Sequence, residues 1–273
     1  MNRYSFFYNW GGEMAYETIK LVVVDRVATL TLNRPQAMNS LNEVMAHELV
    51  DCFESLKSNK EVQVLVLKGE GKAFSAGGDI KMMLQSNDSA DFDSLMEEIT
   101  KIVLAFYQLP MMTIASVHGA AAGLGFSLAL AADIVLADET SKLAMNFIGI
   151  GLVPDGGGHF FMKERLGVPK AKQVIWEGKV MNAQEAYQLG LIDQLVPEGK
   201  SELVITQLVQ KLLSSPISAM IETKQIYHQQ KLPELKEIME LEAIAQLRMR
   251  KTEDHLEGIQ AFVEKRKPNF KGK

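Results

Sequence analysis

A single aspartate stands between an apolar run and three glycines in the segment GIGLVPDGGG, residues 149–158. A carboxylate that leaves water without a partner is strongly destabilised, or it takes up a proton instead. Asp155 therefore has two interpretations. It caps the helix predicted for HFFMKERLG, residues 159–167, because Asp is a preferred N-cap residue. Alternatively, it is an acid–base group kept reactive by dry surroundings.

Two opposing effects set the pKa of this carboxyl group. A helix N-terminus favours the charged form by about 0.3–1 kcal/mol, which is less than one pKa unit. Full burial disfavours the charged form by roughly 3–5 pKa units. Burial should therefore dominate if the loop excludes water, and capping should dominate if the loop is open to solvent.

Two glycine-rich turns, GKAFSAGGDIK (71–81) and HGAAAGLGFSLALAAD (118–133), could supply a second kind of chemistry. Each follows a predicted strand and opens a predicted helix, which leaves backbone N–H groups without partners. Two such turns in one α/β unit could aim two N–H donors at one oxygen, as in an oxyanion hole. The alternative is that they are tight turns with close packing. Neither turn has the spacing of a dinucleotide-binding or phosphate-binding loop.

The elements that must position these turns alternate between strand and helix. Period-two or continuous apolar runs predict strands, and apolar residues at helical spacing predict helices. This alternation indicates an α/β fold with parallel strands. The predicted strands are residues 26–35, 62–71, 111–119, 134–139 and 142–145, and the predicted helices are residues 40–59 and 123–133.

From about residue 170 the pattern becomes helical, including residues 171–196. We expect one α/β core, residues 14–200, followed by a helical oligomerisation region, residues 201–273, because no Gly/Ser linker or charge block separates them. The start of the chain is unusual, since codons for the WGGE before Met14 can spell a purine-rich ribosome-binding site. We expect residues 1–13 to be a non-native or disordered extension.

The composition excludes several classes of function. A net charge of −5 argues against a nucleic-acid partner, which favours a basic surface. The single cysteine, Cys52, lies in an amphipathic pattern, so we interpret it as a packing residue, and a reducing cytoplasm fits. The sequence has no run of 18 apolar residues, so no membrane-spanning helix is predicted. No cluster of His, Cys or Asp has metal-ligand spacing, so no metal is expected.

Several motifs in order carry a resemblance to one family. The motifs are, in order, LNRPQAMNSLN, AFSAGGDI, HGAAAGLGFSLALAADIVLAD, GIGLVPDGGG and EGIQAFVEKRKPNF, and the similarity covers essentially residues 16–270. The chain resembles the enoyl-CoA hydratase/isomerase (crotonase) superfamily. That resemblance implies a ClpP-like spiral of ββα repeats with a C-terminal helical trimerisation region, assembled as a homotrimer or a dimer of trimers. It also implies an acyl-CoA substrate, with coenzyme A as part of the substrate and no other cofactor.

The same resemblance assigns expected roles to particular residues. The backbone N–H groups of Gly78 and Leu124 would hold the thioester oxygen as it becomes an enolate. Arg34 and the backbone near Ala37 would line the nucleotide end of CoA, and Phe262 and Lys265 would reach CoA, from a neighbouring subunit. Further residues at positions where the family contacts its substrate are Ala76, Asp79, Ile80, Ser127 and Phe147.

The subtype follows from the carboxylates. Hydratases of this family use two glutamates, and the matching positions here hold Ser127 and Phe147. Asp155 matches the acidic residue of peroxisomal-type enoyl-CoA isomerases and of the ring-epoxide isomerases of phenylacetate catabolism. The resemblance therefore implies an acyl-CoA isomerase with Asp155 as its acid–base group. Alternatives are hydration, thioester hydrolysis, or a non-catalytic acyl-CoA-binding or RNA-binding homologue.

Overall fold

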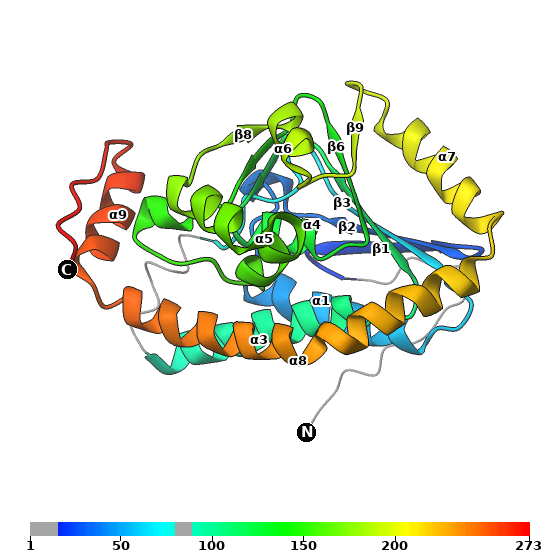
Figure 1. Ribbon diagram of the computed structural model, residues 1–273, viewed down its shortest axis with the longest axis horizontal. Coiled ribbons are helices and arrows are strands. Elements are labelled where there is room, and N and C mark those ends of the chain that lie inside the picture. The colour runs from blue at the N-terminus through cyan, green and yellow to red at the C-terminus, as the bar shows by residue number, and fades with distance from the viewer. Residues whose placement is uncertain (1–15, 80–88) are drawn as a thin grey trace.

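A mostly parallel sheet forms the centre of the fold (Figure 1). The computed structural model describes residues 16–79 and 89–273. Strands β1 and β2 form an antiparallel hairpin, and every later neighbour in the sheet is parallel. The strand order is β1 (Ile19–Val24), β2 (Val27–Leu32), β3 (Val64–Gly69), β4 (Met112–Val117), β6 (Ile134–Asp138) and β9 (Gln194–Val196).

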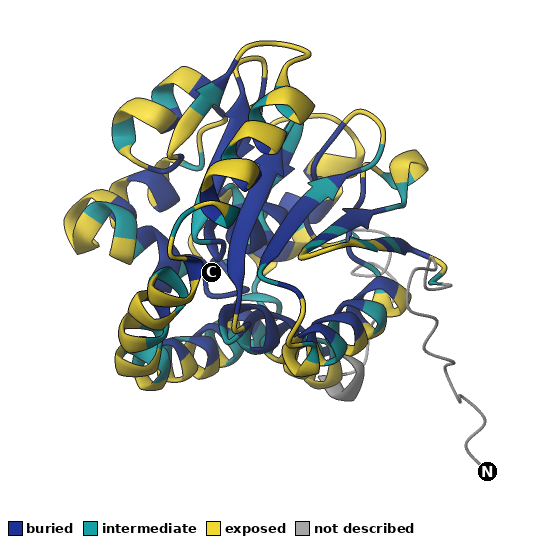
Figure 2. Cartoon of the chain, turned by 90° about the vertical axis from the view of Figure 1, so that its right-hand side faces the viewer, coloured by how far each residue is buried: buried dark blue, intermediate teal, exposed yellow. Residues whose placement is uncertain are grey.

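The predicted parallel α/β arrangement is confirmed. Parallel strands are covered by helices on both faces, so they read as continuous apolar runs. The run MTIASV of β4 is buried at all its positions, and VLVLKG of β3 is buried at all but one. In Figure 2 these strands are dark blue, between helices whose outer faces are exposed.

The prediction that residues 171–196 are helical is wrong in two places. Strand β8 (Met181–Asn182) pairs with β7 (Lys142–Ala144) in a smaller sheet that also holds β5 (Ala120–Ala122), and β9 pairs with β6. Both strands are too short to show a period of two in the sequence. Their partners lie much earlier in the chain, so only the tertiary fold reveals them.

Three helices pack together along one side of the larger sheet (Figure 1). They are α1 (Glu43–Ser58), α3 (Ser89–Tyr107) and α8 (Ile217–Met249). Helix α1 buries a stripe that includes Cys52, which is fully buried, as expected of a packing residue. Helix α3 lies between the other two and contacts both.

The remaining helices include α4 (Leu124–Leu130), which is buried along its whole length, as predicted. Helix α5 (Gly158–Glu177) is interrupted at Gly167, where φ is 69° and ψ is 157°. No helix in the described ranges is long and apolar enough to cross a membrane. The others are α6 (Ala183–Leu189), α7 (Ser201–Leu213), α9 (Glu253–Val263) and the 3-10 turns η1 (Pro35–Ala37) and η2 (Phe147–Ile150).

A buried ion pair attaches α8 to the core. The ammonium group of Lys224 donates to Oδ2 of Asp133 at 2.8 Å and to the carbonyl oxygen of Met111 at 2.7 Å. The same Oδ2 accepts hydrogen bonds from the backbone N–H and the hydroxyl group of Thr113. Nearby, the imidazole ring of His228 stacks on Tyr107 with centroids 3.8 Å apart. These contacts set the position of α8 relative to the ends of the strands.

We expect Lys224→Met to lower the free energy of unfolding by about 3–5 kcal/mol, because it leaves the Asp133 carboxylate buried without its cation. Lys231 is the matched control on the same helix, where it forms ion pairs with Glu164 and Glu234 at the surface. Lys231→Met should cost less than about 1 kcal/mol. Urea unfolding of both variants tests this, and equal losses would contradict the assignment of Lys224 as an anchor.

Candidate active site

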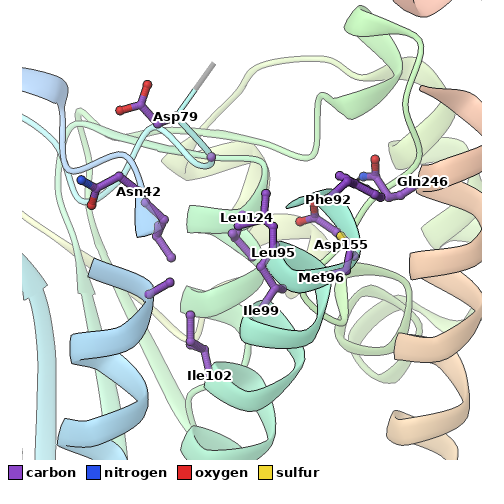
Figure 3. Close-up of a pocket in the computed structure, with 13 residues that line it drawn as sticks. Asn42, Asp79, Phe92, Leu95, Met96, Ile99, Ile102, Leu124, Asp155 and Gln246 are labelled. Carbon is purple, nitrogen blue, oxygen red and sulfur yellow. Dashed lines mark hydrogen bonds between the residues drawn. The ribbon is translucent and has the colours of Figure 1, made fainter. Parts of the chain in front are cut away.

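A cavity lies between the two glycine turns, α3 and α8 (Figure 3). The empty space between its walls, including the part open to solvent, is about 550 Å³. Most of its wall is apolar, and its polar lining side chains lie on two sides, Asn42 and Asp79 on one and Asp155 and Gln246 on the other (Figure 3). The described residues that line it are Leu41, Asn42, Ala46, Gly78, Asp79, Phe92, Leu95, Met96, Ile99, Ile102, Leu124, Asp155 and Gln246.

Helix α3 supplies the largest part of the apolar wall. Its lining residues recur every three or four positions, which places them on one face of the helix. The guanidinium group of Arg250 stacks on the ring of Phe92 at 4.5 Å from the ring centroid. The lining residues of α3 are Phe92, Leu95, Met96, Ile99 and Ile102.

The two glycine turns lie side by side, as expected for an oxyanion hole. The N–H of Ser75 donates to the carbonyl oxygen of Ala120 at 3.0 Å, and the N–H of Ala122 donates back to Ser75 at 3.0 Å. Gly78 and Leu124 consequently line one cavity. Among the described residues, neither of their N–H groups has a backbone or side-chain acceptor.

Two glycines allow this close approach. Gly77 has a φ of 95°, and a Cβ there would lie 2.7 Å from the carbonyl oxygen of Ala122. Gly123, the N-cap of α4, has a φ of 51°. Both conformations are strained for any other residue. The turns therefore depend on glycine at these positions to bring the N–H of Leu124 to the cavity wall.

The carboxyl group of Asp155 lies in this cavity, between Leu124 and Gln246 in the view of Figure 3. Asp155 is partly buried as a residue, but its Oδ1 has no contact with solvent and no hydrogen-bond partner in the described part of the chain. Its Oδ2 accepts one hydrogen bond, from the side-chain amide of Gln246 at 3.3 Å. Burial raises the pKa of Asp155 well above its usual value, and the negative charge of Glu242 raises it further.

The interpretation of Asp155 as a helix cap is wrong. Helix α5 begins at Gly158, with Gly157 as its N-cap, and no side chain of that segment caps it. Glu242 of α8 does so instead, because its carboxylate accepts from the N–H of Gly157 at 2.8 Å and from the N–H of His159 at 2.9 Å. It also contacts Nδ1 of His159 at 2.8 Å. The carboxyl group of Asp155 therefore does not cap α5.

Ser127 and Phe147 lie behind the cavity wall rather than on it. Ser127 is fully buried, and its hydroxyl group donates to the backbone carbonyl of Asp155 at 2.9 Å. The ring of Phe147 lies against Gly123, where a Cβ would be 3.4 Å from it. In this structure Ser127 positions the loop, and Phe147 supports the turn that presents Leu124.

Arg34 and Asp79 pair with each other at 3.2 Å, and both side chains are largely buried. Arg34 also donates to the carbonyl oxygen of Ser40 at 2.6 Å. Asp79 lines the cavity, whereas Arg34 does not. Ala37 ends η1, and the N–H of Ala76 donates to the carbonyl oxygen of Met38 at 2.9 Å, so both belong to the surrounding turns.

Phe262 and Lys265 lie at the end of α9, and neither lines the cavity of this chain. Phe262 is 55% exposed. Its expected contact with CoA, bound to a neighbouring subunit, stays a prediction. Ile80 lies outside the described residues. No group of three or more His, Cys, Asp or Glu within residues 16–79 and 89–273 could hold a metal ion.

Sequence reasoning missed Gln246 and Glu242. They are four residues apart on α8, so they share one face of that helix. Both are almost fully buried, at 1% and 3% exposure. In a charged helical stretch, a buried glutamine or glutamate cannot be distinguished by sequence from one on a solvent-exposed face. Their burial could have been inferred only from the position of α8.

The comparisons with known proteins identify a family for this chain. The family model described as enoyl-CoA hydratase/isomerase matches residues 24–273. The chain is 51% identical to YhaR of Bacillus subtilis, provisionally named an enoyl-CoA hydratase/isomerase, over 89% of this chain and 95% of YhaR. It is 32% identical to the trans-2-decenoyl-[acyl-carrier-protein] isomerase of Streptococcus mutans, over 95% of this chain and all of that protein.

A solved structure gives the same fold. The crystal structure of an enoyl-CoA hydratase from Mycobacterium avium subsp. paratuberculosis superposes with a TM-score of 0.85 and 32% identity, over 94% of this chain and all of the other. The fold is that of a crotonase-fold enzyme. The chain belongs to the enoyl-CoA hydratase/isomerase family.

We expect Asp155→Asn to be more stable than the wild type at neutral pH, with a Tm higher by about 2–4 °C. Folding raises the pKa of Asp155. The stability that the protonated carboxyl group contributes is therefore fully present below the unfolded-state pKa of about 4, and it is lost as the pH rises through the folded-state pKa. The neutral amide does not undergo this loss.

Thermal unfolding of Asp155→Asn and wild type between pH 4 and pH 8 tests this expectation. The difference in Tm should grow with pH and then level off. Glu242→Gln is the contrasting variant and should lower Tm, since it removes the charged acceptor at the start of α5. An Asp155→Asn protein less stable than wild type at pH 8 would contradict the assignment of a desolvated carboxyl group.

Proposed function

We propose that this protein is an acyl-thioester isomerase that shifts a double bond through an enolate, with Asp155 as the acid–base group. One observation carries the proposal. A buried carboxyl group, one oxygen of which has no partner among the described residues, lines the same cavity as the N–H groups of Gly78 and Leu124, which have no acceptor in that part of the chain. Such donors stabilise an oxyanion, and such a carboxyl group can exchange a proton near neutral pH.

The proposed reaction conserves atoms and charge. The Asp155 carboxylate removes a proton from C2 of a 3-enoyl thioester, and the electron pair moves to the thioester oxygen, where the N–H groups of Gly78 and Leu124 stabilise it. The protonated carboxyl group then returns a proton at C4 as the enolate collapses. The double bond has moved from C3 to C2. One carboxyl group can perform both transfers if it reaches both carbons.

The raised pKa of Asp155 suits both halves of this cycle. A carboxyl group at its usual pKa is too weak a base to remove a proton next to a thioester at a useful rate. Burial raises the pKa of Asp155, and the excluded water also strengthens the oxyanion hole. The apolar wall of α3 would hold the hydrocarbon chain and complete the exclusion of water.

Hydration of a 2-enoyl thioester is the second candidate, since hydratases are among the relatives. It requires a group that activates water in addition to one that protonates the substrate. The acidic residues among those that line the described cavity are Asp79 and Asp155, and Asp79 pairs with Arg34. Glu242 is close, but its carboxylate caps α5. These contacts favour isomerisation over hydration and over thioester hydrolysis.

The thioester carrier and the assembly are part of the proposal. We expect coenzyme A as part of the substrate, with Arg34 and the backbone near Ala37 at its nucleotide end and no other cofactor. Phe262 and Lys265 would contact coenzyme A bound to a neighbouring subunit. The relative from Streptococcus mutans is named for an acyl-carrier-protein substrate, so that carrier is the alternative. A homotrimer or dimer of trimers would cover the exposed apolar side chains of α8 and α9, among them Ile226, Tyr227, Leu241, Ile244, Leu256 and Phe262.

We expect the protein to isomerise 3-enoyl-CoA to 2-enoyl-CoA and to hydrate 2-enoyl-CoA slowly or not at all. Asp155→Asn should lower kcat by at least about 10³-fold while the Kd for an acyl-CoA changes little, because the amide keeps the shape and loses the proton transfer. Absorbance assays with each thioester, and the same acyl group on acyl carrier protein, measure this. Full activity in Asp155→Asn, or hydration faster than isomerisation, would overturn the proposal.

A second prediction concerns the oxyanion hole. Leu124 is the first residue of α4, a position that accepts proline, so Leu124→Pro removes its N–H with little disturbance of the helix. We expect a loss of about 10²–10³ in kcat. Leu124→Ala keeps the N–H and is the control, with a smaller loss from the shortened side chain. Equal losses would show that the side chain of Leu124, rather than its N–H, supports the reaction.

A further inference from the structure

The side-chain amide of Gln246 reaches the Asp155 loop at two points. Its nitrogen is 2.6 Å from the carbonyl oxygen of Val153 and 3.3 Å from Oδ2 of Asp155. A backbone carbonyl can only accept a hydrogen bond, so the atom beside Val153 must be the NH₂ group. The orientation of the amide is therefore determined, and it presents a donor to Asp155.

A donor at Oδ2 makes the two oxygens of Asp155 unequal. When the carboxyl group is protonated, the proton is disfavoured on Oδ2, because two donors would then face each other. It resides on Oδ1, the buried oxygen without a partner among the described residues. We infer that Gln246 is a positioning residue that assigns the transferred proton to Oδ1 and holds that oxygen toward the substrate. This inference rests on the proposed role of Asp155.

The backbone of the loop has further hydrogen bonds besides the one that Gln246 donates to Val153. The carbonyl oxygen of Asp155 accepts hydrogen bonds from the hydroxyl group of Ser127 and from the N–H of Gly158. One turn earlier on α8, Glu242 caps α5 in place of Asp155. Gln246 is consequently the described residue that contacts the carboxyl group itself by a hydrogen bond. Its removal should affect the titration of Asp155 more than the course of the loop.

Other charged groups also face this region and define the background for a pH measurement. Glu242 raises the pKa of Asp155, and His159 lies against Glu242. Asp79, which pairs with Arg34, lines the cavity on the side away from Gln246 (Figure 3). The remaining groups nearby are Arg250, over Phe92, and His255, whose Nδ1 contacts the carbonyl oxygen of Ile150. None of these changes when Gln246 is replaced.

The direction of the effect follows from the donor. An N–H that donates to a carboxylate favours the charged form and holds the pKa down. Gln246→Met has a similar size and no donor, so the pKa of Asp155 should rise. Gln246→Glu keeps the shape but adds a negative charge when ionised, so the pKa of Asp155 should rise further. A purely structural glutamine would leave the pKa of Asp155 unchanged in Gln246→Met, because its amide would then not stabilise the carboxylate.

The test is the pH profile of kcat/KM for isomerisation in wild type, Gln246→Met and Gln246→Glu. The acidic limb should move to higher pH in both variants, further in Gln246→Glu, and kcat on the plateau should fall by about 10–100-fold. The control is Gln225→Met on the same helix, which removes an amide that donates to the carbonyl oxygen of Leu109 at 3.3 Å, away from the cavity. It should leave the profile unchanged.

A second measurement does not depend on turnover. The carboxyl carbon of Asp155 can be followed by NMR in protein labelled with 13C-carboxyl aspartate and assigned by its loss in Asp155→Asn. Its titration should move to higher pH in Gln246→Met. An unchanged titration and an unchanged acidic limb in Gln246→Met would overturn the inference about Gln246. Retained activity in Asp155→Asn would instead overturn the proposed function, so the two failures are distinguishable.

Discussion

The burial of one incompletely hydrogen-bonded carboxyl group is the constraint on which the site depends. Oδ1 of Asp155 is out of contact with water and has no partner among the described residues, an arrangement that costs stability and that the rest of the fold must offset. Its effect is to raise the pKa of Asp155 toward the range useful for proton transfer. Unpaired buried polar groups concentrate at functional sites for this reason.

Helix α8 makes this burial possible. Lys224 anchors the helix to Asp133 near its start, and Glu242 and Gln246 contact the Asp155 loop near its end. Glu242 satisfies the start of α5, and Gln246 orients the carboxyl group that this capping leaves available. The C-terminal region therefore does more than extend the fold, because it supplies part of the polar environment of the cavity in its own chain.

The proposed oxyanion donors are positioned by a different feature of the fold, the two glycine turns. Hydrogen bonds between the two glycine turns bring Gly78 and Leu124 to one wall, and the positive φ angles of Gly77 and Gly123 permit that approach. The donors are backbone groups of two turns that are hydrogen-bonded to each other, so they need little reorganisation when charge develops on the oxygen. Such a site requires few particular side chains, because its donors are backbone atoms and its acid is a single side chain.

The sequence alone was sufficient to predict the parallel α/β core, because β3, β4 and α4 carry continuous apolar runs. It was also sufficient to predict the glycine turns, because few residues other than glycine adopt their φ angles. It also singled out Asp155, but the residues alone left open whether this aspartate caps a helix or acts as an acid–base group. Only the tertiary structure decided that Glu242 takes the cap, that Gln246 contacts Asp155, and that β8 and β9 are strands. Each of these depends on contacts between segments far apart in the chain, which local spacing does not encode.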